Sequence, residues 1–232
     1  SWKTCALHAA VKLEVFTVLG DQRLTGEEVT QKIDGALRGV ERLLNAMVAM
    51  DLLSKKDGRF GNTHSSKAFL SKHSKKYLGH IIMHHHHLVE SWSHFDHAVL
   101  SGQPIRKRSS FSQEEWRESF LMGMFNLAMG LAPQLVPLID ISSHRHLLDL
   151  GGGPGTYAIH FCLRNSGLHA TVYDLPTNRP FSERTIQQFD LADRIAFMDG
   201  NYLDDPIAGR YDVAWLSHIL HGEGPEDCQM II

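Results

Sequence analysis

The stretch LLDLGGGPGTYAIHF, Leu147–Phe161, places four glycines and a proline between a short apolar run and a segment with helical spacing. The run HLLDL, residues 146–150, has the length and composition of a buried parallel strand. Open α/β sheets bind ligands at the carboxyl ends of their strands, where these glycines stand. Because glycine has no Cβ, ligand atoms can approach its backbone closely. The stretch therefore predicts a ligand-binding loop at the edge of a parallel sheet.

Two kinds of nucleotide cofactor would account for this loop. The dinucleotide pattern G-x-G-x-x-G fits Gly151 and Gly153, but its third glycine falls on Thr156 and Pro154 lies inside it. The pattern D-x-G-x-G-x-G, the first motif of S-adenosylmethionine (SAM) methyltransferases, is complete. It consists of Asp149, Gly151, Gly153 and Gly155. The second pattern is therefore favoured over the first.

The next apolar run, ATVYDLP, ends in a second acidic residue. Asp174 follows Asp149 by about 25 residues and precedes Leu175. An acid near this spacing accepts the ribose hydroxyls in nucleotide-binding sheets, because its two oxygens can take two O–H donors at once. Its presence favours a nucleoside site over a glycine turn without a ligand.

The chain divides into a helical part and an alternating part. The runs HLLDL, ATVYDL, RIAFMDG and YDVAWLS alternate with helical stretches, which predicts an α/β fold with a doubly wound parallel sheet. Before them, a capping-box spacing at Thr25 and Glu28 starts a helix, a second helix follows, and Asp57-Gly58 marks a hairpin turn. Helix, helix, hairpin is the order of a winged helix. We expect domains at 1–110 and 111–232, a linker over 101–113, and single helices over 74–100 and 114–139.

The composition limits the partners and the cellular location. The 232 residues are 43% hydrophobic and carry a net charge of -3, too little to predict nucleic acid or an anionic membrane as a partner. No apolar run approaches the roughly 20 residues that span a bilayer, and no secretory signal is recognisable. Three scattered cysteines predict reduced thiols in the cytoplasm.

Taken in order, these motifs resemble the family of SAM-dependent O-methyltransferases that includes plant caffeate-type and bacterial polyketide and tetrapyrrole enzymes. The matching stretches are FNLAM (125–129), LLDLGGGPG, YDLP, DRIAFMDGNYLDDP and YDVAWLSHILHGEGPEDC, and the resemblance covers nearly the whole chain. It implies a Rossmann-like class I methyltransferase sheet behind a helical, winged-helix dimerisation domain. It also implies SAM as cofactor, methyl transfer to a hydroxyl of a small aromatic or polyketide-like acceptor, and a homodimer through the N-terminal helices.

The resemblance also assigns site residues. The cofactor-binding residues that it implies are Asp149, Gly151, Gly153, Gly155, Asp174, Leu175, Asn201, Tyr202 and Ser217. Asn201 stands where the family has the acid that accepts from the adenine amino group. Phe125 and Met129 would line the acceptor pocket, and His221 would be the general base. Gly222 and Glu223 replace an aspartate and a tryptophan of the family's motif.

Several alternatives remain at this point. The changes at Gly222 and Glu223 leave open a SAM-binding relative that hydroxylates or decarboxylates its substrate. A winged-helix DNA-binding regulator would use Arg38 and Arg42.

A stripe of histidines is the strangest feature of the composition. The stripe consists of His80, His84, His87 and His94, which share one face of the expected helix. Imidazoles at this spacing can bind zinc, but no cysteine or acidic set completes a site, and we predict no metal.

The visible strands make up only part of the usual methyltransferase sheet, and its C-terminal part is expected to be missing. The fourth strand would be an exposed edge. We therefore expect the chain to be either strongly dimeric or poorly stable.

Overall fold

The computed structural model describes residues 1–105 and 114–232. It divides into two compact units, Ser1–Gly123 and Met124–Ile232. The domain boundary expected at residue 110 lies outside the described residues, as does most of the expected linker.

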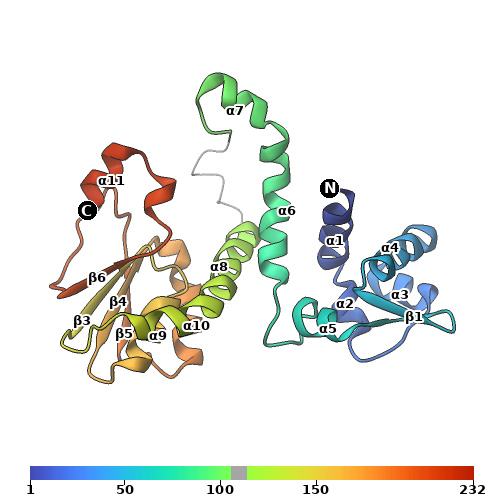
Figure 1. The fold of residues 1–232 in the computed structure, drawn as a ribbon, viewed down its shortest axis with the longest axis horizontal. Coiled ribbons are helices and arrows are strands. Elements are labelled where there is room, and N and C mark those ends of the chain that lie inside the picture. The colour runs from blue at the N-terminus through green and yellow to red at the C-terminus, as the bar shows by residue number, and fades with distance from the viewer. Residues whose placement is uncertain (106–113) are drawn as a thin grey trace. The chain divides into compact units, whose positions relative to one another are not determined.

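The first unit is helical with one hairpin (Figure 1). Its elements are α1 (Trp2–Lys12), α2 (Val15–Leu19), α3 (Gly26–Ile33), α4 (Leu37–Ala49), β1 (Leu53–Lys56), β2 (Arg59–Asn62), α5 (His64–Leu70), α6 (Gly79–Ser93) and α7 (Phe95–Ser101), followed by the start of α8 (Glu114–Leu135). The predicted capping box begins α3: Glu28 N–H donates to the Thr25 hydroxyl at 3.2 Å, and Thr25 N–H donates to the Glu28 carboxylate at 2.7 Å. The turn between β1 and β2 has positive φ at Asp57 and Gly58, as this residue pair predicts.

The single helix expected over residues 74–100 is wrong. The structure has two helices, α6 and α7, separated at His94, whose φ of -111° and ψ of 23° leave the helical region. The Ser93 hydroxyl donates to the Glu90 carbonyl at 2.6 Å, and His94 Nδ1 lies 2.9 Å from the same oxygen. Side chains that bond to a helix carbonyl compete with the backbone N–H groups, and here they coincide with the break.

The side chains of His84, His86 and His87 of α6 pack against rings of other helices in the first unit. Ring centroids lie 5.4 Å apart for His86 and His8 of α1, 5.1 Å for His84 and Phe120 of α8, and 4.8 Å for His87 and Trp116 of α8, the last pair being stacked. Burial and the neighbouring His86 lower the pKa of His8. Within the described ranges, no group of three or more His, Cys, Asp or Glu could hold a metal ion. These imidazoles therefore act as packing groups between helices.

The second unit is built on a parallel sheet in the order β5-β4-β3-β6 (Figure 1). Its strands are β3 (His146–Leu150), β4 (His169–Asp174), β5 (Ile195–Asp199) and β6 (Val213–Leu216). Its helices are α9 (Thr156–Arg164), α10 (Arg179–Gln188) and α11 (Pro225–Ile231), with 3-10 turns η2 (Val136–Leu138), η3 (Pro176–Asn178) and η4 (Leu220–Gly222). All four predicted strands are confirmed, and so is the α/β fold.

The strand order places the glycine stretch at a point where the chain changes direction. From β3 the chain continues to β4 on one side, whereas β6 pairs with β3 on the other side. Ligands of open α/β sheets bind in the crevice at such a switch point. Leu147 and Val172 of the central strands are buried with Ile159 and Phe161 of α9, so this part of the sheet is a rigid base for the loops above it.

One described helix, over Trp116–Leu138, is long and apolar enough to cross a bilayer by length and composition alone. The expectation that no segment reaches this length is therefore wrong. The core helix of a soluble protein passes the same test, so the finding by itself is weak support for a membrane span.

Candidate functional site

The glycine loop between β3 and α9 adopts backbone angles that favour glycine. Gly151, Gly153 and Gly155 have φ values of 64°, 53° and 76°. A Cβ on Gly151 would lie 2.4 Å from a methyl group of Ile219, and one on Gly155 would lie 3.1 Å from Val172. Both the angles and the close neighbours therefore require glycine in this loop.

Asp149 supports the loop from below. Its side chain is 1% exposed and accepts the N–H of Ala158, in the first turn of α9, at 3.1 Å. The N-cap of α9 is Gly155, which has no side chain, so Asp149 satisfies an N–H group that a capping side chain would otherwise serve. The pKa of Asp149 is raised to about 7: burial is the main cause, the Ala158 N–H opposes the rise, and the charge of Asp174 adds to it. This geometry favours a positioning role over the direct cofactor contact that we expected.

Asp174 lies at the carboxyl end of β4 and is joined to the glycine loop. Its Oδ2 accepts the N–H of Gly153 at 2.7 Å. Its Oδ1 accepts the Leu175 N–H at 2.7 Å and the Asn178 side-chain amide at 2.9 Å. The predicted ribose acid and the predicted methionine loop are thus neighbours, with their relative position set by a hydrogen bond.

Asn201 uses its side chain inside its own turn. Its Oδ1 accepts the Leu203 N–H at 3.2 Å, its amide donates to Asp204, and its backbone N–H donates to Asp205 at 2.8 Å. The oxygen expected to accept from an adenine amino group is therefore bonded to Leu203 in this arrangement. The adenine contact stays a prediction.

His221 lies in η4, beyond the end of β6, and is exposed. Its ring stands edge-on to that of His218, with centroids 5.9 Å apart. His218 is also exposed and has a φ of 57°, an uncommon backbone conformation for a residue with a side chain. Ser217, which precedes it, is half-buried. Sequence reasoning missed His218, although a second histidine three residues before His221 was a signal.

A second missed residue is Glu223. The Tyr202 hydroxyl donates to Glu223 Oε1 at 2.8 Å, so the turn after β5 is joined to the end of η4. The sequence identified Glu223 only as the residue that replaces the tryptophan of the family's motif.

The predicted acceptor-pocket residues lie on the second-unit part of α8. The sulfur of Met129 is 3.4 Å from His160 Nε2 on α9, and Phe125 is half-buried. Burial lowers the pKa of His160. Met129 therefore packs against α9, and the pocket role of both residues stays a prediction.

The residues present fit a nucleoside cofactor. Beneath the glycine loop, the buried hydroxyls of Thr156 and Ser182 have no hydrogen-bond partner among the described residues, and a Cβ on Gly155 would come within 3.4 Å of the Ser182 hydroxyl. Buried polar groups rarely remain without partners, so these two hydroxyls suit a ligand or ordered water. Bare backbone and a fixed carboxylate complete the surface that such a cofactor needs.

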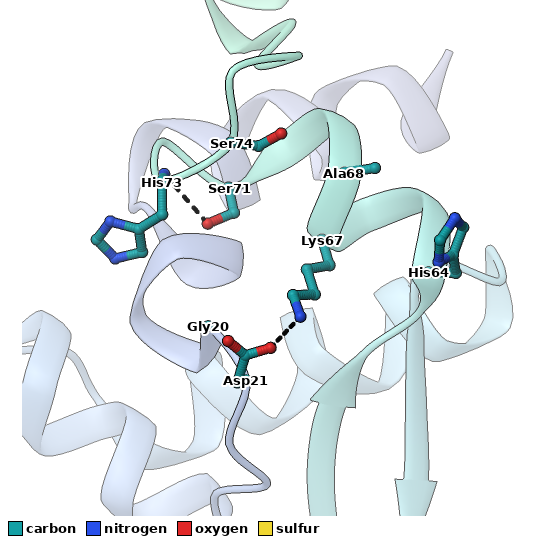
Figure 2. Close-up of a pocket in the computed structure, with 8 residues that line it drawn as sticks. All are labelled: Gly20, Asp21, His64, Lys67, Ala68, Ser71, His73 and Ser74. Carbon is teal, nitrogen blue, oxygen red and sulfur yellow. Dashed lines mark hydrogen bonds and ion pairs between the residues drawn. The ribbon is translucent and has the colours of Figure 1, made fainter.

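The first unit has a cavity of about 360 Å³ between the end of α2 and α5 (Figure 2). Lys67 and Asp21 form an ion pair across it, and the His73 N–H donates to the Ser71 hydroxyl at 3.4 Å. Because Asp21 neutralises Lys67, we assign this cavity no catalytic role.

Two family models match the chain. The model described as the O-methyltransferase dimerisation domain matches residues 1–72, and the model of the O-methyltransferase domain matches residues 89–232. The chain belongs to the O-methyltransferase family. The second match contains the glycine loop, Asp174 and His221, and also the long apolar helix at 116–138.

Individual members of this family are similar over almost the whole chain. The 3-hydroxy-5-methyl-1-naphthoate 3-O-methyltransferase of Streptomyces sahachiroi is 30% identical over 95% of the chain and 66% of its own length. The N,N-dimethyltransferase OxyT of Streptomyces rimosus is 28% identical over 93% and 65%. A solved O-methyltransferase family structure from Burkholderia thailandensis superposes with a TM-score of 0.85 at 27% identity, covering 98% of the chain and 70% of the other. The chain thus spans about two thirds of these relatives' length.

Proposed function

We propose that this protein transfers a methyl group from SAM to a hydroxyl oxygen of a small aromatic or polyketide-like acceptor. The observation that carries the proposal is the hydrogen bond from Gly153 N–H to Asp174, which joins the glycine loop to the acid expected to bind ribose. The match of residues 89–232 to the O-methyltransferase domain supports it.

The loop and the acid would hold opposite parts of the cofactor. Gly151 to Gly155 would contact the methionine part through bare backbone, and Asp174 would accept from the ribose diol. Leu175, Asn201 and Tyr202 would border the adenosine, with Ser217 near the end of β6. When bound, SAM supplies a methyl group on a positively charged sulfur, which is a good leaving group. The residues of the chain would align the acceptor with that methyl group and exclude water.

His221 is the proposed general base. An imidazole can take the proton of a phenolic hydroxyl at neutral pH as the new bond forms, which contributes about 10²–10⁴-fold in rate. Its place in η4 supports this role, since Ile219, two residues earlier, lies against the Gly151 backbone.

The acceptor atom is proposed as oxygen because of the family match and the 30% identical naphthoate O-methyltransferase. The relative named as an N,N-dimethyltransferase makes nitrogen the second candidate. The same family match gives less support to a hydroxylase, a decarboxylase or a DNA-binding regulator.

We also propose a homodimer formed through the N-terminal helices, in the cytoplasm. The dimerisation-domain match over residues 1–72 supports the dimer. Large apolar side chains of the first unit are exposed, as a subunit interface requires; these are Trp2, Trp92, Phe95, Val99 and Leu100.

Calorimetry with S-adenosylhomocysteine and transfer of labelled methyl groups to phenolic acceptors test the function. We expect the intact protein to bind the nucleoside and to form an O-methylated product. His221→Ala should lower kcat about 10²-fold or more without changing nucleoside affinity. The matched control is His169→Ala, which removes a histidine at the opposite end of the sheet and should leave kcat unchanged. Absence of nucleoside binding would refute the proposed function, and an unchanged kcat in His221→Ala would refute the base.

A further inference from the structure

The hydrogen bond between Tyr202 and Glu223 spans the site. Tyr202 follows β5 and Glu223 follows η4, which lies beyond β6. In the sheet order β5-β4-β3-β6 these two strands are at opposite sides, separated by β4 and β3. The 2.8 Å bond therefore crosses the carboxyl ends of the strands that carry Asp174 and the glycine loop.

The loop lies against Tyr202 and against Ile219, which begins the segment that leads to Glu223. A Cβ on Gly151 would be 2.4 Å from Ile219 Cγ2 and 3.5 Å from Tyr202 Cε1. Ile219 is buried with Leu150 and Tyr173, and the Tyr202 ring packs against the same cluster. The first glycine of the loop, the turn after β5 and the segment before His221 thus pack together as one unit.

The segment that carries His221 is anchored by the buried side chain of Ile219 and by the Cys228 thiol, which donates to the Leu220 carbonyl at 3.2 Å. It is a single 3-10 turn, held by the Gly222 N–H to the Ile219 carbonyl at 3.1 Å and the Glu223 N–H to the Leu220 carbonyl at 3.3 Å. Short 3-10 turns have poor hydrogen-bond geometry and are weak by themselves. A tertiary bond at Glu223 fixes the end of this turn, two residues from the imidazole.

We propose that Tyr202 and Glu223 are a positioning pair that holds residues 219–223, and with them His221, against the glycine loop. The phenol donates and the carboxylate accepts, so the bond is charge-assisted and stronger than one between neutral groups. Glu223 occupies the position of a tryptophan in the family's motif, so the hydrogen bond depends on a residue in which this chain differs from that motif. The effect on catalysis rests on the proposed role of His221; the effect on the turn does not.

Four variants and one control separate the bond from other effects. Tyr202→Phe removes the donor and keeps the ring, and Glu223→Leu removes the acceptor. Glu223→Gln keeps an acceptor oxygen without the charge, and the double variant Tyr202→Phe/Glu223→Leu removes both partners. The control is Tyr211→Phe, which removes a tyrosine hydroxyl that donates to the Ala208 carbonyl at 2.8 Å in the same unit.

Amide hydrogen exchange of the ligand-free protein tests the turn itself. We expect the Gly222 and Glu223 amides to exchange about three- to tenfold faster in Tyr202→Phe and Glu223→Leu, with no further change in the double variant. Glu223→Gln should restore most of the protection, and Tyr211→Phe should match the parent protein. Unchanged exchange in Tyr202→Phe, or additive effects in the double variant, would overturn the proposal.

Steady-state kinetics tests the consequence for His221. We expect kcat to fall about tenfold in Tyr202→Phe and Glu223→Leu, while the dissociation constant of S-adenosylhomocysteine changes less than about threefold. Affinity that falls as much as kcat would mean that the pair supports the cofactor rather than the base, and would overturn the positioning role. If no methyl transfer occurs in any variant, the proposed function fails, and the exchange experiment still decides whether the pair holds the turn.

Discussion

Asp149 is a carboxyl group with two separate constraints, a backbone donor in α9 and almost complete burial. Burial dominates, because removing a carboxylate from water costs more than one hydrogen bond returns. The pKa of Asp149 is consequently raised to about 7. A folded-state pKa above the unfolded value means that the folded protein binds this proton more tightly than the unfolded chain.

The pH dependence of stability follows from that difference. Below about pH 4 the Asp149 carboxyl is protonated in both the folded and the unfolded state, and the stability that its raised pKa contributes is fully present. Between pH 4 and 7 only the folded state keeps the proton, so the free energy of unfolding falls by up to about 4 kcal/mol as pH rises. Asp149→Asn should remove this fall, so the variant should gain in relative stability as pH rises from 5 to 8. Urea unfolding at both pH values measures it. The control is Asp193→Asn at an exposed site, and parallel pH profiles for Asp149→Asn and the parent protein would contradict the argument.

At the scale of elements, the connection from β3 to α9 combines a ligand surface with a packing contact. Its glycines have positive φ angles, and Ile219 and Val172 lie close to where side chains on Gly151 and Gly155 would stand. A side chain in this connection would therefore disturb both the loop and the segment beyond β6.

Gly151→Ala tests this connection. The left-handed φ of 64° and the 2.4 Å approach of Ile219 should together lower the free energy of unfolding by about 1–3 kcal/mol and weaken nucleoside binding. Gly39→Ala is the matched control: the new methyl group meets nothing within 4 Å in the first turn of α4, and alanine should stabilise that helix by up to about 1 kcal/mol. Denaturant unfolding and calorimetry measure both effects. Equal stabilities for the two variants would show that the loop tolerates a side chain.

At the scale of the whole molecule, exposed apolar surface favours association. In the first unit, Trp92 is 65% exposed and Leu100 is 85% exposed. Contiguous exposed apolar side chains on a helical domain are typical of subunit interfaces.

The dimer is tested by changing these two residues. We expect the parent protein to have twice the monomer mass by light scattering, and Trp92→Glu/Leu100→Glu to shift it to the monomer, because charged groups would be buried at the interface. Leu163→Glu is the control, since Leu163 is 51% exposed on α9 of the other unit. A stable monomeric parent protein would rule out the dimer.

Much of the secondary structure was predictable from sequence patterns of neighbouring residues. The four strands, the capping box at Thr25 and the turn at Asp57-Gly58 depend on residues a few positions apart. Each was visible in the sequence for that reason. The helix break at His94 was missed because side-chain bonds to one carbonyl leave no periodic signal.

Within the site, the sequence by itself determined which residues the glycine loop contains and which acid follows the second strand, since both depend on short motifs and their spacing. Only the tertiary structure decided that Asp149 is buried beneath the loop and that Tyr202 bonds to Glu223. Those contacts depend on strand order and on the packing of loops at one edge of the sheet. Tyr202 and Glu223 are 21 positions apart and meet because the parallel strands β5 and β6 end at the same edge of the sheet. No local pattern in the chain encodes that strand order.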